Sequence, residues 1–283
     1  MKTITLTTAL TLISSMLFCQ PKTFTFKTNN QTEIILLSEG QREGKPNNLI
    51  DASAKQLSET MPNGTYTSAT NAFLVRTTNG KNILVDAGYG SELFNNIKSL
   101  GITADSIHAI LITHMHGDNI GGLLDKDGKK TFPNAKLYLP SQEYTHYVDR
   151  SSSLNDNARK AGMAVIQAYG EQKLVLFQPE KGMVEDCVKP IYAIGHTPGH
   201  TVYQIDNMLI WGDLTHVMDI QMPYPNVAIT YDTDSKLAVS SRLKMLKYIV
   251  DNNLNIAGMH IAYPGMGTIK TNGKSGYIFT PLK

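Results

Sequence analysis

The chain has 283 residues, of which 41% are hydrophobic and 18% are charged. This composition is typical of a packed globular protein, and it excludes a disordered, collagenous or low-complexity chain. The 26 lysines and arginines nearly balance the 24 aspartates and glutamates, for a formal net charge of +2. Because the sequence contains no dense basic stretch, we do not expect a nucleic-acid partner.

Residues 1–20 have the pattern of a secretory signal peptide. Met1 and Lys2 precede a mostly apolar and hydroxylated run, Ile4 to Phe18, that contains no acidic residue. The run is too short and too rich in Thr and Ser for a membrane span, which needs about 20 mainly apolar residues. We therefore expect an exported, periplasmic or secreted protein of residues 21–283. Its precursor is either cleaved near Cys19 or, alternatively, anchored by a lipid on Cys19.

The first half of the mature chain predicts strands that later alternate with helices. Four runs rich in β-branched and aromatic residues predict strands, at 24–27, 33–38, 72–77 and 82–86. A helix over 92–100, ended by Gly101, then precedes a strand over 108–113, a helix start near Asn119 and a strand over 136–139.

The second half is again rich in predicted strands. Polar residues dominate 142–159, and 161–168 predicts a helix. Four more strands follow, at 173–177, 190–194, 202–206 and 208–211. The last clear helix covers 234–250, where apolar residues recur at helical spacing and Asp232 or Thr233 can cap the first amides. The whole pattern predicts two sheets with helices outside them, in one α/β domain.

Residues that carry chemistry concentrate in the sequence LITHMHGDNIGG, which begins at Leu111. His114 and His116 are two residues apart at the end of a predicted strand, so their side chains point the same way and can bind one ion. Asp118 follows in a loop, where its carboxylate can reach the same ion or a neighbouring one. Zinc binds such mixed nitrogen and oxygen donors, with three protein ligands and a water at catalytic sites. Since a histidine pair alone is also compatible with an ordinary polar loop, the interpretation depends on further ligands.

Three later motifs supply such ligands. His196 and His200 lie in the turn GHTPGHT, Asp213 follows the strand in LIWGD, and His260 ends the segment GMH. Side chains that are delivered from strand ends to one edge of a rigid scaffold are well placed to build a metal site.

The ordered motifs THMHGDNIGG, HTPGHT, WGD and MH resemble the metallo-β-lactamase superfamily, from about Ala72 to the C-terminus. Residues 212–216, 232–236 and 260–267 are similar to its methyl parathion hydrolase and lactonase-like branch. The resemblance implies a four-layer αββα sandwich with two metals, most simply zinc, in a cleft at the sheet edges. It implies that His114, His116 and His196 hold a first metal and that Asp118 and His260 hold a second. It also implies that Asp213 bridges the two metals.

Asn119 departs from the family pattern H-x-H-x-D-H, in which this position holds a histidine ligand. An amide oxygen is neutral and binds zinc more weakly than imidazole does. Three alternatives follow: one tightly bound zinc ion, two ions of which the second is labile or a different divalent metal, or a degenerate site. Because Asp118, Asp213 and His260 are retained, we expect metal chemistry.

The resemblance also implies roles around the metals. His216 matches a position that faces the substrate, where it is expected to donate a hydrogen bond to the oxygen that gains charge; the alternative is a surface histidine in a loop. His200 and Asp86 are expected to orient the ligand loops without binding metal.

The function that follows is metal-dependent hydrolysis of an ester-like bond in a small molecule. Water activated by the metal is expected to attack a lactone, a carboxylic ester or a phosphotriester. Asp118 and Asp213 are expected to position the water and to handle its proton, together with His216 as the catalytic residues. The competing class is a non-catalytic or degenerate metal- or ligand-binding protein, which Asn119 makes plausible. The sequence does not set the oligomeric state.

Overall fold

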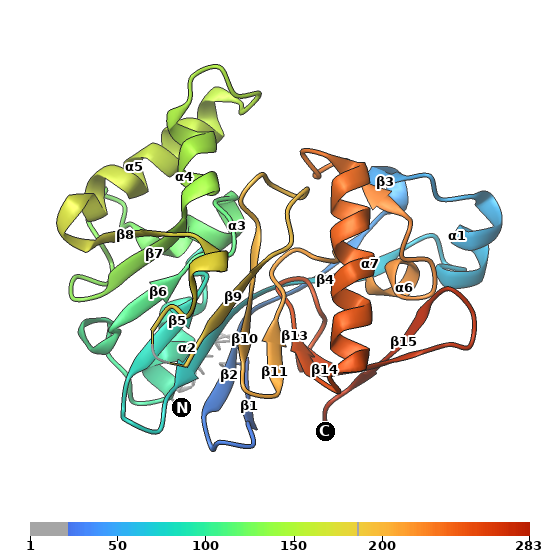
Figure 1. The fold of residues 1–283 in the computed structure, drawn as a ribbon, viewed down its shortest axis with the longest axis horizontal. Coiled ribbons are helices and arrows are strands. Elements are labelled where there is room, and N and C mark those ends of the chain that lie inside the picture. The colour runs from blue at the N-terminus through green and yellow to red at the C-terminus, as the bar shows by residue number, and fades with distance from the viewer. Residues whose placement is uncertain (1–21, 186) are drawn as a thin grey trace, which may run out of the picture.

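Two β-sheets pack face to face and carry helices on both outer faces (Figure 1). The computed structural model describes residues 22–185 and 187–283, so the expected signal peptide and Cys19 lie outside the described residues. In Figure 1, α4 and α5 lie on the left and α7 to the right of the centre, with β9, β10 and β11 drawn between them. This is the four-layer αββα arrangement that the family resemblance implies.

The first sheet has seven strands in the order β1-β2-β4-β5-β6-β7-β8. Their bounds are β1 (Lys22–Lys27), β2 (Glu33–Gly44), β4 (Tyr66–Arg76), β5 (Asn82–Val85), β6 (Ala109–Leu111), β7 (Lys136–Pro140) and β8 (Leu174–Phe177). Pairing is antiparallel from β1 to β5 and parallel from β5 to β8. Parallel neighbours need crossover connections. These contain α2 (Leu93–Ser99), α3 (Gly117–Ile120), α4 (Ser141–Val148) and α5 (Asp156–Lys173).

The second sheet has six strands in the order β15-β14-β13-β11-β10-β9. Their bounds are β9 (Lys189–Tyr192), β10 (Thr201–Ile205), β11 (Met208–Ile210), β13 (Asn255–Ala257), β14 (Met266–Thr271) and β15 (Tyr277–Pro281). Only β11 and β13 pair in parallel among these described strands, and the chain between them contains α7 (Ser235–Asp251).

Shorter elements lie outside the two sheets. A separate two-stranded pair joins β3 (Leu49–Ile50) to β12 (Ala228–Ile229), and α1 (Ala54–Thr60) packs near α6 (Met218–Gln221). Four 3-10 helices complete the described elements: η1 (Pro46–Asn48), η2 (Ala104–Ser106), η3 (Gly121–Leu123) and η4 (Pro179–Lys181).

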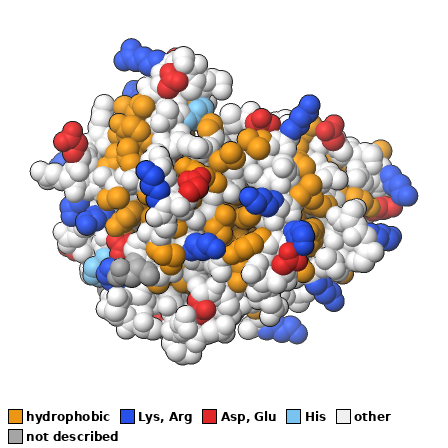
Figure 2. All heavy atoms as spheres, viewed as in Figure 1, with side chains coloured by type: hydrophobic (Ala, Val, Ile, Leu, Met, Phe, Trp, Pro, Cys, Tyr) orange, Lys and Arg blue, Asp and Glu red, His pale blue; other side chains and the backbone are white. Residues whose placement is uncertain are grey.

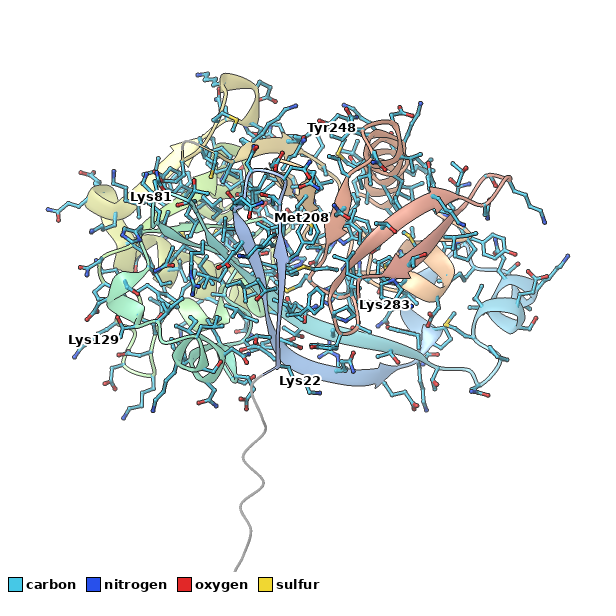
Figure 3. All side chains as sticks on the ribbon, turned by 90° about the horizontal axis from the view of Figure 1, so that it is seen from below. Lys22, Lys81, Lys129, Met208, Tyr248 and Lys283 are labelled. Atoms are coloured by element: carbon cyan, nitrogen blue, oxygen red, sulfur yellow. The ribbon has the colours of Figure 1, made fainter. Side chains whose placement is uncertain are left out.

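The β2 strand shows how the layers form. Successive side chains of a strand point to opposite faces. Ile34 and Leu36 therefore pack between the two sheets, whereas Ile35 and Leu37 pack under the helices of the first outer layer. Met208 of β11 joins the core between the sheets, and Figure 3 shows it in the middle of the molecule, with Lys81 and Lys129 at the edge.

The outer helix α7 covers the second sheet. Met245, Leu246 and Ile249 of α7 lie in one buried cluster with Trp211 and Ile256. Burying a large apolar side chain contributes about 1.5–3 kcal/mol, so this face is the main reason for the helix to dock here. The predicted helix over 234–250 is thus confirmed.

Several predicted element boundaries need correction. The polar stretch 142–159 contains α4 and the start of α5, because both helices expose a polar face and Asn155 caps the second by accepting from the Ala158 amide at 2.9 Å. The α7 cap is Asp234, which accepts from the Leu237 amide at 3.0 Å. Asp232, which the sequence offers as a cap, binds His196 instead. Strand β6 ends at Leu111, earlier than predicted.

The surface shows no segregation of charge on the face seen in Figure 2, where Lys and Arg side chains are dispersed with Asp and Glu among them. In the part of the chain that the structure describes, no helix combines the length and apolar character needed to cross a bilayer.

Candidate metal centre

The loops that follow strands at one edge of the two sheets carry the candidate ligands. His114 and His116 lie in the loop between β6 and α3, so a loop presents the pair and not the strand itself. Asp213 follows β11 and His260 follows β13, and these two strands are parallel neighbours whose carboxyl ends share an edge. His196 lies between β9 and β10.

Four donor atoms form a first cluster. His116 Nδ1 lies 3.0 Å from His114 Nε2 and 3.1 Å from His196 Nε2, and the latter two atoms are 3.2 Å apart. Asp213 Oδ2 lies 3.4 Å from His196 Nε2 and 3.6 Å from His114 Nε2. Tetrahedral zinc with imidazole nitrogens about 2.0–2.1 Å away holds its donors roughly 3.3 Å apart. The cluster therefore has the dimensions of a zinc site.

A second cluster shares the same carboxylate oxygen. Asp213 Oδ2 lies 3.0 Å from His260 Nε2 and 3.2 Å from His216 Nε2. Asp118 Oδ2 lies 3.8 Å from His260 Nε2. Because Asp213 Oδ2 belongs to both clusters, Asp213 would be a ligand common to both if each cluster held an ion.

Hydrogen bonds alone do not explain this arrangement. A carboxylate oxygen has two lone pairs, yet four imidazole nitrogens lie within 3.6 Å of Asp213 Oδ2. The other oxygen, Oδ1, is buried and has no hydrogen-bond partner among the described residues. Cations placed between the donors would satisfy these groups, and a set of imidazoles and carboxylates is one that zinc prefers. The residues present therefore fit a metal centre.

The electrostatics of the cluster point the same way. Burial opposes the charge of Asp213, but the neighbouring His260 and His114 outweigh it and hold the pKa of Asp213 well below its usual range. Burial also opposes the charge of His196, whereas its hydrogen bonds to Asp213 and Asp232 raise its pKa to about 9. His260 likewise has its pKa raised to about 9 against burial, mainly by Asp213. Without metal, two protonated imidazoles thus supply the positive charge that ions would bring.

Three buried residues fix the orientation of the ligand loops. Asp232 Oδ1 lies 2.9 Å from His196 Nδ1. His200 lies between two loops, with Nδ1 at 2.9 Å from the Ala193 carbonyl and Nε2 accepting from the Asp213 amide at 3.0 Å. Asp86 Oδ1 accepts from the Thr113 amide at 2.9 Å, and its Oδ2 accepts from the Thr113 hydroxyl at 2.8 Å. Each of them holds a ligand or the backbone next to one.

Glu143 is a further positioning residue that the sequence reading missed. It is fully buried on α4, and its two oxygens accept from the amides of Met115 and Gly199 and from the Thr197 hydroxyl. Thus one carboxylate ties the His114–His116 loop to the His196 loop. Its sequence context, PSQEYTHY, resembles any polar helix surface, and no local signal marks it as buried.

Asn119 is buried in the same region but is anchored to Asp86. Its Nδ2 donates to Asp86 Oδ2 at 3.2 Å and to Thr113 Oγ1 at 3.3 Å. Its Oδ1 is buried and has no partner among the residues described. The amide oxygen of asparagine also ends one bond closer to its own backbone than the Nε2 of a histidine does. The other predicted ligands converge in the two clusters, whereas the Nδ2 of Asn119 is bound to Asp86 and Thr113.

A cleft with a volume of about 520 Å³ opens over both clusters. His116, Asp118, His196, Asp213, His216 and His260 line its floor. The remaining wall comes from segments far from the motifs and contains two cations, an amide and three tyrosines: Arg42, Lys45, Asn48, Tyr66, Tyr89 and Tyr231. Among the described residues that line the cleft there is no Leu, Ile, Val, Met or Phe.

Comparison with known proteins agrees with this geometry. The model of the Metallo-beta-lactamase superfamily matches residues 65–251, about two thirds of the chain, so the protein belongs to that superfamily. Hydroxyacylglutathione hydrolase of Photobacterium profundum is 28% identical over 141 residues, which are 50% of this chain and 45% of that protein. Anti-Pycsar protein Apyc1 of Bacillus phage BSP38 is 45% identical over 106 residues, 37% of this chain and 39% of that protein. The chain thus matches less than half the length of these curated relatives.

Solved structures match over nearly the whole chain. Hydrolase AbOPH of the beta lactamase superfamily has a TM-score of 0.82 at 27% identity, covering 93% of this chain and 98% of its own. AidC, described as a dizinc quorum-quenching lactonase in complex with a product, has a TM-score of 0.82 at 24% identity, with the same coverage. The similarity to AidC shows only that the two proteins share a fold.

Proposed function

We propose that the protein is a zinc-dependent hydrolase that cleaves an ester-like bond in a small molecule: a lactone, a carboxylic ester or a phosphotriester. The observation that carries the proposal is the convergence of three imidazole nitrogens and one carboxylate oxygen under an open cleft. Zinc at such a site lowers the pKa of a bound water towards ~7 and polarises the oxygen of the bond to be cleaved.

The side chains around the clusters have separable tasks in this reaction. His114, His116 and His196 would hold a first ion, and Asp213 would be shared with a second. The buried carboxylate of Asp213 lies at the floor of the cleft, where it would orient the attacking water. Asp118 lies at the cleft floor, where burial and the nearby Asp213 raise its pKa, so it is suited to take up and return a proton.

The cleft wall favours a substrate that carries a negative charge away from the scissile bond. Arg42 and Lys45 are exposed in the cleft and form no ion pair with any described residue. Apart from the histidines of the floor, the rings of the described lining residues belong to tyrosines, and these residues include no aliphatic wall that suits a long acyl chain. We therefore propose a polar ester or lactone with a carboxylate or phosphate group that these cations bind.

The alternative function, a degenerate binding protein, is suggested only by Asn119. The other donors of both clusters are in place, and relatives that match the chain include hydrolases by name. We therefore propose catalysis in preference to binding alone.

The test is hydrolysis of a panel of lactones, carboxylic esters and phosphotriesters, with and without a second negative charge, by metal-free and zinc-reconstituted protein. We expect hydrolysis only after zinc is restored, and none from a His196→Ala variant. No turnover of any class by zinc-loaded protein would instead support the binding-protein alternative.

Two further parts of the proposal come from sequence alone. We propose that residues 1–20 export the chain and that residues 21–283 act as one catalytic domain. N-terminal sequencing of the protein from the culture medium or periplasm tests the first.

A further inference from the structure

The second cluster has fewer imidazole donors than the first, and Asn119 stands where the family pattern has a histidine. Asp213 and His260 converge there, with Asp118 at 3.8 Å from His260 Nε2. Asn119 is held against Asp86 and Thr113 by its own amide. Asp213 and His260 alone are two donors, whereas catalytic zinc sites use three protein donors. Asp118, the third candidate, lies further from His260 than Asp213 does. A further imidazole near Asp213 would strengthen the set.

His216 is placed to do so. Its Nε2 lies 3.2 Å from Asp213 Oδ2, and its ring stacks on that of His260 with centroids 4.9 Å apart. The donor atoms of Asp213, His216 and His260 all lie within 4.8 Å of one another. The side chain is only 7% exposed, and its Nδ1 has no hydrogen-bond partner among the described residues. Among the described residues, only those of the cluster therefore contact the ring nitrogens of His216.

Two buried side chains form hydrogen bonds with the backbone around His216. Buried Gln221 uses one oxygen to accept from the amides of His216, at 2.7 Å, and Val217, at 3.0 Å. Buried Arg242 donates to the Leu214 carbonyl at 2.8 Å and to the Val227 carbonyl at 2.7 Å. A surface histidine in a mobile loop has no need of such support, whereas a metal ligand must be fixed before the ion arrives.

We infer that His216 is a ligand of the second metal ion and replaces the histidine that is missing at position 119. The second ion is then held by Asp213, His216 and His260, with Asp118 at the cleft side. This inference rests on the proposed function, because it presumes the two-ion centre. It assigns His216 to the metal and not to a hydrogen bond with the substrate.

The inference is tested by metal binding in the absence of substrate. Metal-free protein is titrated with zinc against a chromophoric chelator, and the titration is repeated with cobalt, whose absorption reports the number and type of donors. In wild-type protein we expect two ions per chain. In His216→Ala we expect one ion bound as before, with the dissociation constant of the second raised about 100-fold or more, beyond what loss of an outer partner causes.

Three controls separate a ligand from a structural residue. His146→Ala, a histidine on α4 away from the cleft, is expected to bind both ions as wild type does. His216→Asn has a shorter polar side chain and is expected to bind the second ion as weakly as His216→Ala does. Asn119→His introduced into His216→Ala is expected to restore the second ion, which also shows that the first variant was folded.

The possible failures are distinct. A His216→Ala variant that still binds two ions with unchanged affinity overturns the inference, and loss of hydrolysis in that variant would assign His216 to the substrate. Wild-type protein that binds only one ion, with no change on removal of His216, also overturns it. Wild-type protein that binds no ion removes the proposed function itself.

Discussion

Glu143 Oε2 accepts a hydrogen bond from the hydroxyl of Thr197 over 2.7 Å, and so connects helix α4 to the loop that carries His196. The other oxygen, Oε1, accepts from the Met115 amide at 2.9 Å, and Met115 lies between the predicted ligands His114 and His116 in the chain. Both oxygens of this buried carboxylate are therefore occupied by the two loops of the first cluster. A metal site with three imidazoles requires that the loops carrying them vary in position by less than the length of a hydrogen bond.

Replacing Glu143 by Gln should weaken both the fold and the first metal site. One oxygen becomes an NH₂ group facing a backbone N–H, which leaves a buried donor unpaired at a cost of about 1–3 kcal/mol. We expect that loss in urea unfolding of the metal-free protein, and a zinc affinity reduced about 10- to 100-fold. Glu171→Gln, an exposed carboxylate on α5, is the matched control and should change neither value. Wild-type zinc affinity in Glu143→Gln would show that the two loops hold themselves in place.

Zinc binding should release protons, and its affinity should rise with pH. In the metal-free protein burial opposes the charged forms of His196 and His260, but Asp213 with its neighbours raises both pKa values to about 9. Both imidazoles therefore carry a proton at pH 7 that zinc must displace. Affinity should increase by up to about 100-fold per pH unit below pH 9 and level off above it. Calorimetry in buffers of different ionisation enthalpy measures the protons released.

Asp232→Asn is the control for that proton release. Its carboxylate lies 2.9 Å from His196 Nδ1 and is one of the groups that raise the histidine's pKa. The variant should release fewer protons at pH 7 than wild type. Equal release by both proteins would contradict the protonation state assigned to His196.

Gly195 permits the close approach of the His196 loop to α7. Its φ is +125°, and a Cβ there would lie 2.1 Å from the backbone nitrogen of Ala238. Gly195→Ala should therefore cost on the order of 3 kcal/mol in unfolding free energy and displace His196. Gly182→Ala has a similar φ of +121° with open space around the site, so it isolates the backbone strain. Equal losses in the two variants would exclude the steric contact as the cause.

Arg42 should determine preference for charged substrates. For an ester with a second negative charge we expect Arg42→Ala to raise KM about fivefold, because an exposed ion pair contributes up to about 1 kcal/mol. KM for a neutral ester of the same alcohol should not change. Arg150→Ala, an exposed arginine after α4, serves as the control. A uniform change across charged and neutral substrates would assign Arg42 to structure and not to substrate binding.

The metal-binding motifs are predictable from sequence because each combines strong local signals. His114 and His116 form a short pattern beside glycines, and His196 lies in a Pro/Gly turn, so residue type and spacing suffice to select them. The two sheets and α7 follow from apolar periodicity in the same way. The sequence motif also selected Asn119 as the doubtful ligand, and the structure shows the amide bound to Asp86.

The supporting residues are not predictable in this way. Glu143, Gln221 and Arg242 are polar residues in helices and are fully or almost fully buried. Glu143 and Arg242 bind backbone groups of distant loops, whereas Gln221 binds the amides of His216 and Val217 just before its own helix. The distant contacts are fixed by tertiary packing, which local pattern does not encode. The same holds for Arg42 and Tyr231, whose segments meet over the cleft from far apart in the chain.

Zinc content per chain, measured by elemental analysis after zinc loading and gel filtration, tests the central claim of a two-ion hydrolase most directly. We expect two zinc ions per chain in the wild-type protein. A value of one would contradict the second site, and a value of zero would contradict the metallohydrolase as a whole.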